Sequence, residues 1–140
     1  MNKEMRLTGK CLCGHVHYES DLPAAFMGKC YCKDCSNESG TGHITTVAVP
    51  DAGLKVTGSL SEYTKKTDDG HRLSKFFCGI CGSTLFTRPD KLPGLVVIRA
   101  GTLDDRSVIK PQLQMYVSRA PAWDRPDASI KSFLEMATEW

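Results

Sequence analysis

Long apolar runs and blocks of like charge are both missing from this 140-residue sequence. Apolar stretches such as "LVVI" at 95–98 have the length of a strand, whereas a membrane-spanning helix needs about 20 residues. The opening "MNKEMRLTG" has no apolar segment of the secretory type. We therefore expect a protein without membrane contacts, located in the reducing environment of the cytoplasm.

The charges of the two signs are balanced. The 18 basic and 16 acidic residues give a formal net charge of +2 and are spread along the chain. Binding to nucleic acid or to anionic lipid usually requires a basic cluster, so we expect neither partner. With 41% hydrophobic residues over 140 positions, the chain has the composition of one globular domain, which we place at residues 1–140.

Short runs that alternate or are rich in β-branched residues predict a mainly β fold. Turn sequences such as "PDAG" at 50–53 and "DDG" at 68–70 separate them. Because many short strands joined by turns favour antiparallel pairing, we expect antiparallel sheets. The expected strands cover residues 15–20, 43–49, 54–58, 60–66, 72–77, 83–87, 95–101 and 112–117.

Helical patterns are scarce. The main candidate is residues 127–137, where Asp127 is a possible N-cap. Apolar residues follow it at helical spacing, namely Ile130, Phe133, Leu134 and Ala137. The segment "CKDCSNESG" at 32–40 predicts a single helical turn that ends at Gly40. The sequence therefore predicts one short helix near the C-terminus and one turn of helix in the first third of the chain.

Seven cysteines, an odd number, fall into three tight groups. In a reducing compartment this indicates metal binding or catalysis rather than disulfides. Cys78 and Cys81 in "CGICG" have the spacing of a zinc knuckle. Cys11 and Cys13 are separated by one residue, and in an extended segment this spacing would place both thiols on one face. Together these residues predict a closed four-cysteine zinc site; a thioredoxin-like redox pair or buried free cysteines are the alternatives.

The middle group, "CYCKDC", supplies Cys30, Cys32 and Cys35 and has no fourth cysteine. We expect Cys30 and Cys32 to share a strand face and Cys35 to lie one turn further on. Three protein ligands with an open fourth position are typical of a catalytic zinc site. Two alternatives stay open: no stable second metal, or closure of the site by one of the histidines, which are His15, His17, His43 and His71.

Four segments resemble the glutathione-dependent formaldehyde-activating enzyme family, which also includes the centromere protein V domain. They are, in order, "GKCLCGHVHYE", "CYCKDCSNESG", "FFCGICGSTLF" and "LVVIRAGTLDD", and the resemblance runs from about Leu7 to about Pro126. It implies a β-tent fold with a structural and a catalytic zinc site. By position the structural ligands are Cys11, Cys13, Cys78 and Cys81, and the catalytic ligands are Cys30, Cys32 and Cys35. Tyr31 stands where the family commonly has a histidine, and we interpret it as a packing residue.

The resemblance implies a zinc-dependent carbon–sulfur lyase that forms or splits S-hydroxymethylglutathione. Zinc is then the cofactor, and glutathione and formaldehyde, or a similar thiol and aldehyde, are the partners. A non-catalytic binding or scaffold module, or a lyase for another thiol or electrophile adduct, are the alternatives, and the oligomeric state stays open. The two carboxylates of glutathione need cationic partners, for which the candidates are Arg72, Lys75, Arg88, Lys91 and Arg99.

Overall fold

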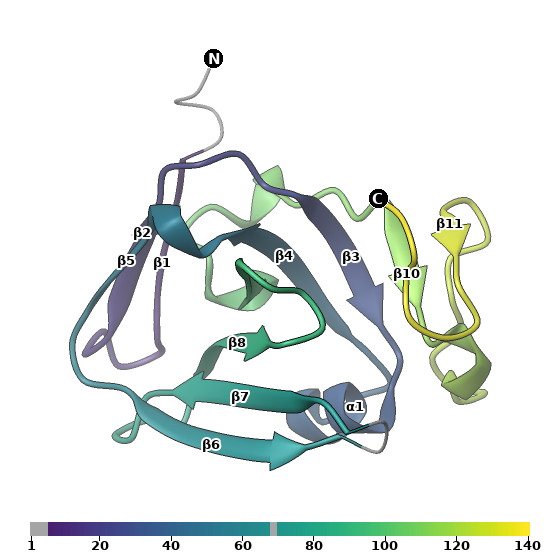
Figure 1. Cartoon of the computed structure of the whole chain (residues 1–140), viewed down its shortest axis with the longest axis horizontal. Helices are drawn as coiled ribbons and strands as arrows, with labels where there is room; N and C mark the ends of the chain where they lie inside the picture. Colours follow the sequence, from purple (N-terminus) through teal and green to yellow (C-terminus); the bar gives the residue numbers. More distant parts are fainter. Residues whose placement is uncertain (1–5, 68–69) are drawn as a thin grey trace.

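Two β-sheets dominate the structure, a computed structural model that describes residues 6–67 and 70–140 (Figure 1). The smaller sheet has the order β1-β2-β5, with β1 at Leu7–Lys10, β2 at His17–Ser20 and β5 at Leu54–Thr57. The larger sheet has eight strands in the order β11-β10-β3-β4-β9-β8-β7-β6. These strands are β3 (Phe26–Cys30), β4 (Ile44–Pro50), β6 (Ser61–Lys66), β7 (Arg72–Phe77), β8 (Thr84–Pro89), β9 (Leu95–Arg99), β10 (Leu113–Met115) and β11 (Lys131–Ser132).

Helical structure is limited in the described ranges to α1, Lys33–Ser39, and to short 3-10 turns. The 3-10 turns are Asp51–Gly53, Ala100–Thr102, Arg106–Val108 and Val117–Arg119. The prediction of a helical turn around residues 32–40 is confirmed, because Cys32 caps α1 and Gly40 ends it in the left-handed conformation, at φ 77°. The predicted turn at 50–53 is also confirmed, whereas two of the three residues predicted as a turn at 68–70 lie outside the described residues.

The mainly β prediction is confirmed, and every expected strand is present with slightly shifted ends. Most pairings are antiparallel, as expected, but β10 runs parallel to both of its neighbours, β3 and β11. Parallel neighbours need long connections rather than tight turns. Since β10 follows β3 by more than 80 residues, nothing in the local sequence pattern indicates its direction.

Two strands of the site region, β1 and β3, were not among the expected ones. Each is short and contains a glycine, which weakens the sequence pattern of a strand. In β3 the glycine has a packing role: a Cβ on Gly28 would lie 2.8 Å from the Leu113 Cδ1 atom of β10. Because Gly28 has no side chain, β10 can pair alongside β3. This pairing places Met115 opposite Cys30.

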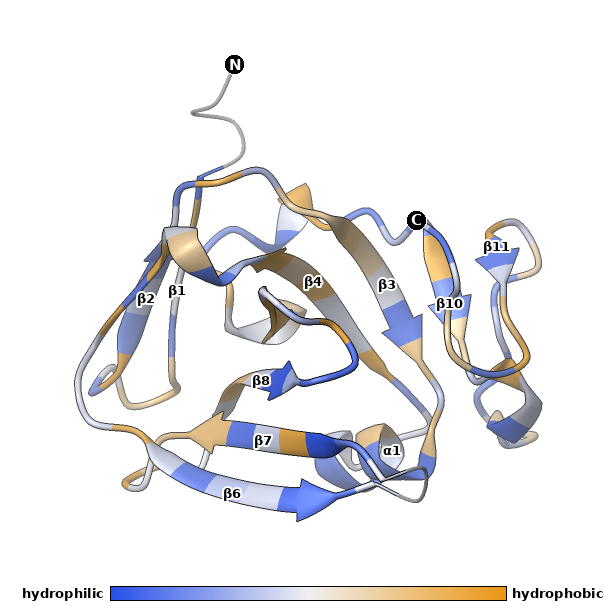
Figure 2. Cartoon of the chain, in the orientation of Figure 1, coloured by the Kyte–Doolittle hydropathy of each residue, from blue (hydrophilic) through white to orange (hydrophobic). Residues whose placement is uncertain are grey.

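Successive buried side chains of β4 point to opposite faces of the strand and so reach two separate apolar cores. Val47 and Val49 lie in the first core, with Val96 and Ile98 of β9 and with residues of the smaller sheet. Ala48 points to the second core, which contains Phe26, Leu92, Leu113, Met115 and Ala137. In Figure 2 the apolar colouring is strong on β4, whereas β6, at the edge of the sheet, is mostly hydrophilic. The two cores therefore lie on opposite faces of β4.

The predicted C-terminal helix is wrong. Within residues 127–137 the structure has only the two-residue strand β11, and Leu134 is 70% exposed. The backbone of this segment pairs with β10 and the turn after it: the Phe133 amide donates to the Gln114 carbonyl at 2.9 Å, and the Tyr116 amide donates to the Glu135 carbonyl at 2.9 Å. These pairings with a distant segment satisfy backbone groups that a helix would have used, and so they override the helical spacing.

Candidate metal centres and the cleft beside them

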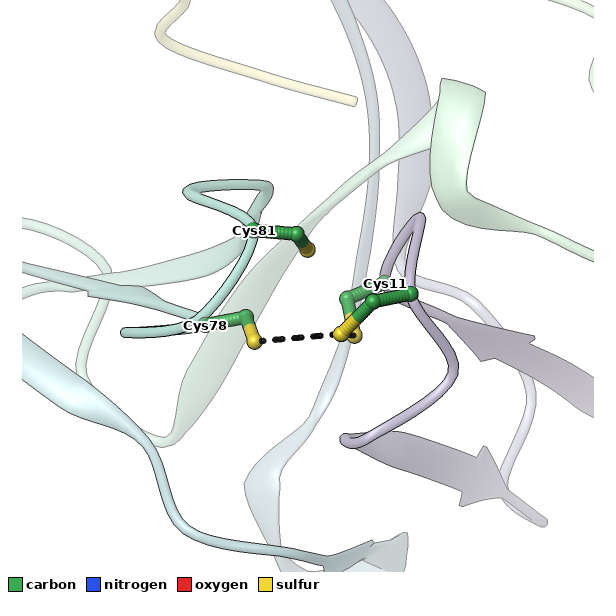
Figure 3. A group of neighbouring side chains, drawn as sticks. Cys11, Cys78 and Cys81 are labelled. Carbon is green, nitrogen blue, oxygen red and sulfur yellow. Dashed lines mark hydrogen bonds between the residues drawn. The ribbon is translucent and has the colours of Figure 1, made fainter.

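The first sulfur group brings together residues from two distant loops. Cys11 and Cys13 lie in the turn after β1, and Cys78 and Cys81 lie in the loop between β7 and β8; Figure 3 shows Cys11 facing Cys78 and Cys81. All four sulfur atoms lie within 4.8 Å of one another. The Cys11–Cys13 and Cys13–Cys78 sulfur distances are 3.7 and 3.8 Å. A tetrahedral zinc ion with four zinc–sulfur bonds of about 2.3 Å separates its sulfurs by about 3.8 Å, so this group has the dimensions of a zinc site.

Tight turns give this group its shape. The expectation of an extended segment at Cys11–Cys13 is wrong, because the Gly14 amide donates to the Cys11 carbonyl at 3.1 Å and closes a turn. The predicted knuckle is confirmed: the Gly82 amide donates to the Cys78 carbonyl at 2.8 Å, and Gly82 has a φ of 78°. Positive φ is readily adopted by glycine, which explains this residue at the end of the knuckle.

Backbone and hydroxyl donors surround these sulfurs. The Val16 amide lies 3.3 Å from the Cys11 sulfur, and the Ile80 amide lies 3.4 Å from the Cys78 sulfur. Hydrogen bonds from Ser83 lower the pKa of the Cys81 thiol to about 5. The Ser83 hydroxyl also accepts a hydrogen bond from the Leu12 amide at 3.0 Å, which connects the two loops. Donors of this kind favour the thiolate form, which is the form that binds zinc.

The second sulfur group consists of Cys30, Cys32 and Cys35, whose sulfur atoms also lie within 4.8 Å of one another. Cys30 ends β3, Cys32 caps α1, and Cys35 lies in the first turn of α1. Cys30 and Cys32 therefore do not share a strand face, because the chain leaves the sheet after Cys30. Hydrogen bonds from Cys30 and Cys35 hold the pKa of the Cys32 thiol far below its ordinary value, and the Cys35 amide lies 3.4 Å from its sulfur.

None of the four histidines, all of which lie in the described ranges, belongs to either sulfur group. His43 instead contacts Asp124 through its Nδ1 atom at 2.6 Å. Its ring lies 4.9 Å from that of Tyr31. Tyr31 is only 1% exposed, and its hydroxyl donates to the Arg125 carbonyl at 3.4 Å, which confirms its interpretation as a packing residue. The structure thus gives no support to closure of the second group by a histidine.

Polar contacts rather than apolar burial hold α1, and with it Cys35, against the sheet. The helix has no buried residue. Glu38 forms a two-pronged ion pair with Arg99 of β9, at 2.5 and 2.9 Å, and both side chains are about one-tenth exposed. Asp34 pairs with Lys65 of β6 at 3.0 Å, in a more exposed position. The position of the Cys35 sulfur relative to Cys30 therefore depends on the charge pair between Glu38 and Arg99.

A cleft of about 610 Å³ lies beside the second sulfur group and is lined by all three of its cysteines. Among the basic residues considered from the sequence, Arg72, Lys91 and Arg99 line this cleft. Arg88 does not; it pairs with Asp51 at 3.0 Å. The His71 side chain also lines the cleft, and further cationic side chains reach it from other elements, namely Lys33, Lys65 and Arg119. Sequence reasoning missed these because they are brought to the cleft only by the folding of α1, β6 and the turn after β10.

Tyr116 was also missed as a cleft residue. It lines the cleft beside Lys91 and has a φ of 57°, the one positive value of a non-glycine residue in the described ranges. Burial raises the pKa of its phenol, while the nearby Lys91 ammonium acts in the opposite direction. A left-handed non-glycine residue costs about 1–3 kcal/mol and is found preferentially at functional sites. No pattern in the sequence around residue 116 signals this conformation.

Two cysteine groups of metal-ligand geometry, one of them at a cleft in a mainly β fold, define a candidate metalloprotein. Residues 6–119 match the family model of the glutathione-dependent formaldehyde-activating enzyme, and the chain belongs to this family. A crystal structure of a Rhodobacter sphaeroides protein has a similar fold, with a TM-score of 0.60 and 21% sequence identity, over 74% of this chain and 96% of that one. In the described part of this chain, no helix is both long and apolar enough to cross a membrane.

Replacing Glu38 with Gln should weaken metal binding at the second sulfur group. The substitution keeps the shape but leaves the buried Arg99 charge unpaired, which typically costs about 3–5 kcal/mol. We expect faster amide hydrogen exchange in α1 and at least about a tenfold loss of zinc affinity at one site, measured by competition with a chromophoric chelator. Asp34→Asn is the matched control, since its ion pair is on the same helix but exposed. If Glu38→Gln binds zinc as tightly as the parent protein, metal binding does not depend on the ion pair between Glu38 and Arg99.

Proposed function

We propose that residues 1–140 form a single zinc-binding β domain that acts as a carbon–sulfur lyase on thiol–aldehyde adducts of the S-hydroxymethylglutathione type. The description of the family names the two reactants, glutathione and formaldehyde. The observation that carries the proposal is the three-cysteine group at the wall of the cleft. A purely structural module would need only the four-cysteine group, so a second, incomplete ligand set beside a cleft favours chemistry on a thiol.

The two sulfur groups would have different roles. Cys11, Cys13, Cys78 and Cys81 offer four sulfurs and would hold a closed structural zinc ion. Such a site can contribute on the order of 10 kcal/mol to folding. Cys30, Cys32 and Cys35 are soft ligands that suit zinc and would leave one position for the substrate. A zinc ion bound there supplies a place where a thiol loses its proton and is held as a thiolate.

The reaction proposed for the cleft is the reversible addition of a thiol to an aldehyde. In the condensing direction, the thiolate sulfur attacks the carbonyl carbon, a carbon–sulfur bond forms, and the carbonyl oxygen takes up the proton that the thiol released. The reverse direction breaks the same bond and returns the proton to the thiol, so no further reactant is needed. With a zinc ion held by three cysteine thiolates, the site would carry one net negative charge before a substrate binds, which would favour release of a thiolate over tight retention.

Arg72 is the best-placed anchor for a substrate carboxylate. Three other cations of the cleft already have acidic partners: Arg99 pairs with Glu38, Lys65 with Asp34, and Arg119 with Glu135. Arg72, at the start of β7, and Lys33, at the start of α1, both line the cleft, and neither side chain has an acidic partner among the described residues. A guanidinium can hold a carboxylate through two parallel hydrogen bonds, which suits the recognition of glutathione.

Changing Arg72 to Gln should impair binding of glutathione adducts selectively. We expect KM for S-hydroxymethylglutathione to rise about tenfold with little change in kcat, as for the loss of one hydrogen bond to a charged group. The adduct of 2-mercaptoethanol, which has no carboxylate, should be unaffected. Arg88→Gln is the control, because Arg88 lies outside the cleft. An equal effect on both adducts would rule out a carboxylate anchor at this position.

A pair of cysteine variants tests the division of roles between the two sulfur groups. Cys32→Ser should remove one zinc and the lyase activity while the domain still unfolds in a cooperative thermal transition. Cys81→Ser should abolish that transition, because the closed site ties the two loops together. Zinc content, calorimetry and adduct turnover are measured on both variants. If Cys81→Ser melts like the parent protein, or if Cys32→Ser keeps its zinc and activity, the assignment of the roles is wrong.

A further inference from the structure

One wall of the cleft is apolar and directly adjoins a sulfur of the second group. Cys30 packs against the second core, and Met115 of β10 lies opposite it in the pairing of β10 with β3. Four apolar side chains of that core or its surroundings also line the cleft, namely Phe26, Leu92, Met115 and Met136. Methionine side chains are flexible and adapt to apolar ligands of different shapes. We refer to these four side chains as the apolar wall.

S-hydroxymethylglutathione has no group that matches this wall. The carbon that comes from formaldehyde carries only hydrogens and a hydroxyl group, and the ends of glutathione are charged. The cationic anchor Arg72 lies on β7, whereas Met115 lies on β10, towards the opposite end of the strand order of the larger sheet. A glutathione carboxylate bound at Arg72 and a substituent packed against Met115 would thus contact different strands of the same cleft. An adduct whose carbon carries an alkyl or aryl group would place that group beside Cys30.

The apolar wall is partly built by a segment that the family match does not include. The match ends at residue 119, and Met136 follows it. This segment is fixed to the sheet: the Phe133 amide donates to the Gln114 carbonyl of β10 at 2.9 Å, and Ala137 is buried in the second core. The ring of Trp140 lies 5.0 Å from that of Phe26. The C-terminal segment therefore adds to this chain a feature of the cleft that the family match does not account for.

We propose that the apolar wall is the subsite for the substituent on the adduct carbon, and that this chain prefers adducts of alkyl or aryl aldehydes to the adduct of formaldehyde. The proposal rests on the proposed lyase function and narrows its substrate class. The reaction remains balanced as before: aldehyde and thiol combine into a hemithioacetal with no other reactant. Burying each additional methylene against the wall should improve substrate selection about fourfold until the wall is covered.

The test uses the zinc-containing protein with glutathione and the series formaldehyde, acetaldehyde, propanal and butanal. We expect kcat/KM to rise by about fourfold per methylene over the first members. Met136→Ala should flatten this rise and Met136→Leu should largely keep it. Leu134→Ala is the matched control, because Leu134 belongs to the same segment but is 70% exposed. A rate that falls from formaldehyde to butanal in the parent protein would overturn the proposal.

A binding series separates this subsite from the lyase function itself. S-methyl-, S-propyl- and S-butylglutathione are inert thioethers that carry an alkyl group where the adduct carbon would be. Calorimetry should give a Kd that falls with alkyl length in the parent and not in Met136→Ala. If affinity rises along the series but no aldehyde is turned over, the subsite stands and the lyase function fails. If formaldehyde is turned over but neither rate nor affinity depends on alkyl length, the lyase stands and the subsite fails.

Discussion

The convergence of four sulfur atoms between the turn after β1 and the β7–β8 loop is the contact on which the arrangement of the two sheets depends. No strand of the smaller sheet pairs with a strand of the larger sheet in the described part of the chain. The sheets are joined instead by the first core, to which Cys11 and Cys78 belong. Hydrogen bonds such as those of Leu12 with Ser83 and of Tyr18 with Thr102 also cross this interface. A metal ion at the edge of the core would add further directional bonds to it.

The second sulfur group is held in a different way, and the difference suits its proposed role. Its helix buries no residue and is oriented by ion pairs, so Cys32 and Cys35 are not enclosed by a core, whereas Cys30 packs against the second core. Charge pairs fix direction without closing the site to solvent or substrate. A group that binds and releases thiols benefits from this arrangement, whereas the first sulfur group is anchored in the first core through its two buried members, Cys11 and Cys78. The same type of ligand thus serves two purposes because its surroundings differ.

The sequence predicted the composition of the site better than its geometry. Cysteine spacing is a local property and divides the seven thiols into three groups. The four-ligand requirement of a closed zinc site then predicts that the first and third groups combine, as the structure shows. The short runs of β-branched residues likewise predict the strands β4 and β9. The position of β3 depends on Gly28 and its contact with Leu113, and the cleft collects Lys65, Arg72 and Arg119 from three elements. Such contacts between distant parts of the chain have no local pattern, and for the same reason the helical spacing after Asp127 was misleading.

The central claim is that the chain holds one closed and one open zinc site, and the most direct test is the zinc content of protein purified under reducing conditions without chelators. The account predicts two zinc ions per chain, one at each sulfur group. Addition of excess glutathione should change the contribution of one site to the zinc X-ray absorption spectrum. The other site should keep its four sulfur ligands. One zinc ion per chain, with no further uptake on reconstitution, would contradict the account, because the three-cysteine group would then not be a metal centre.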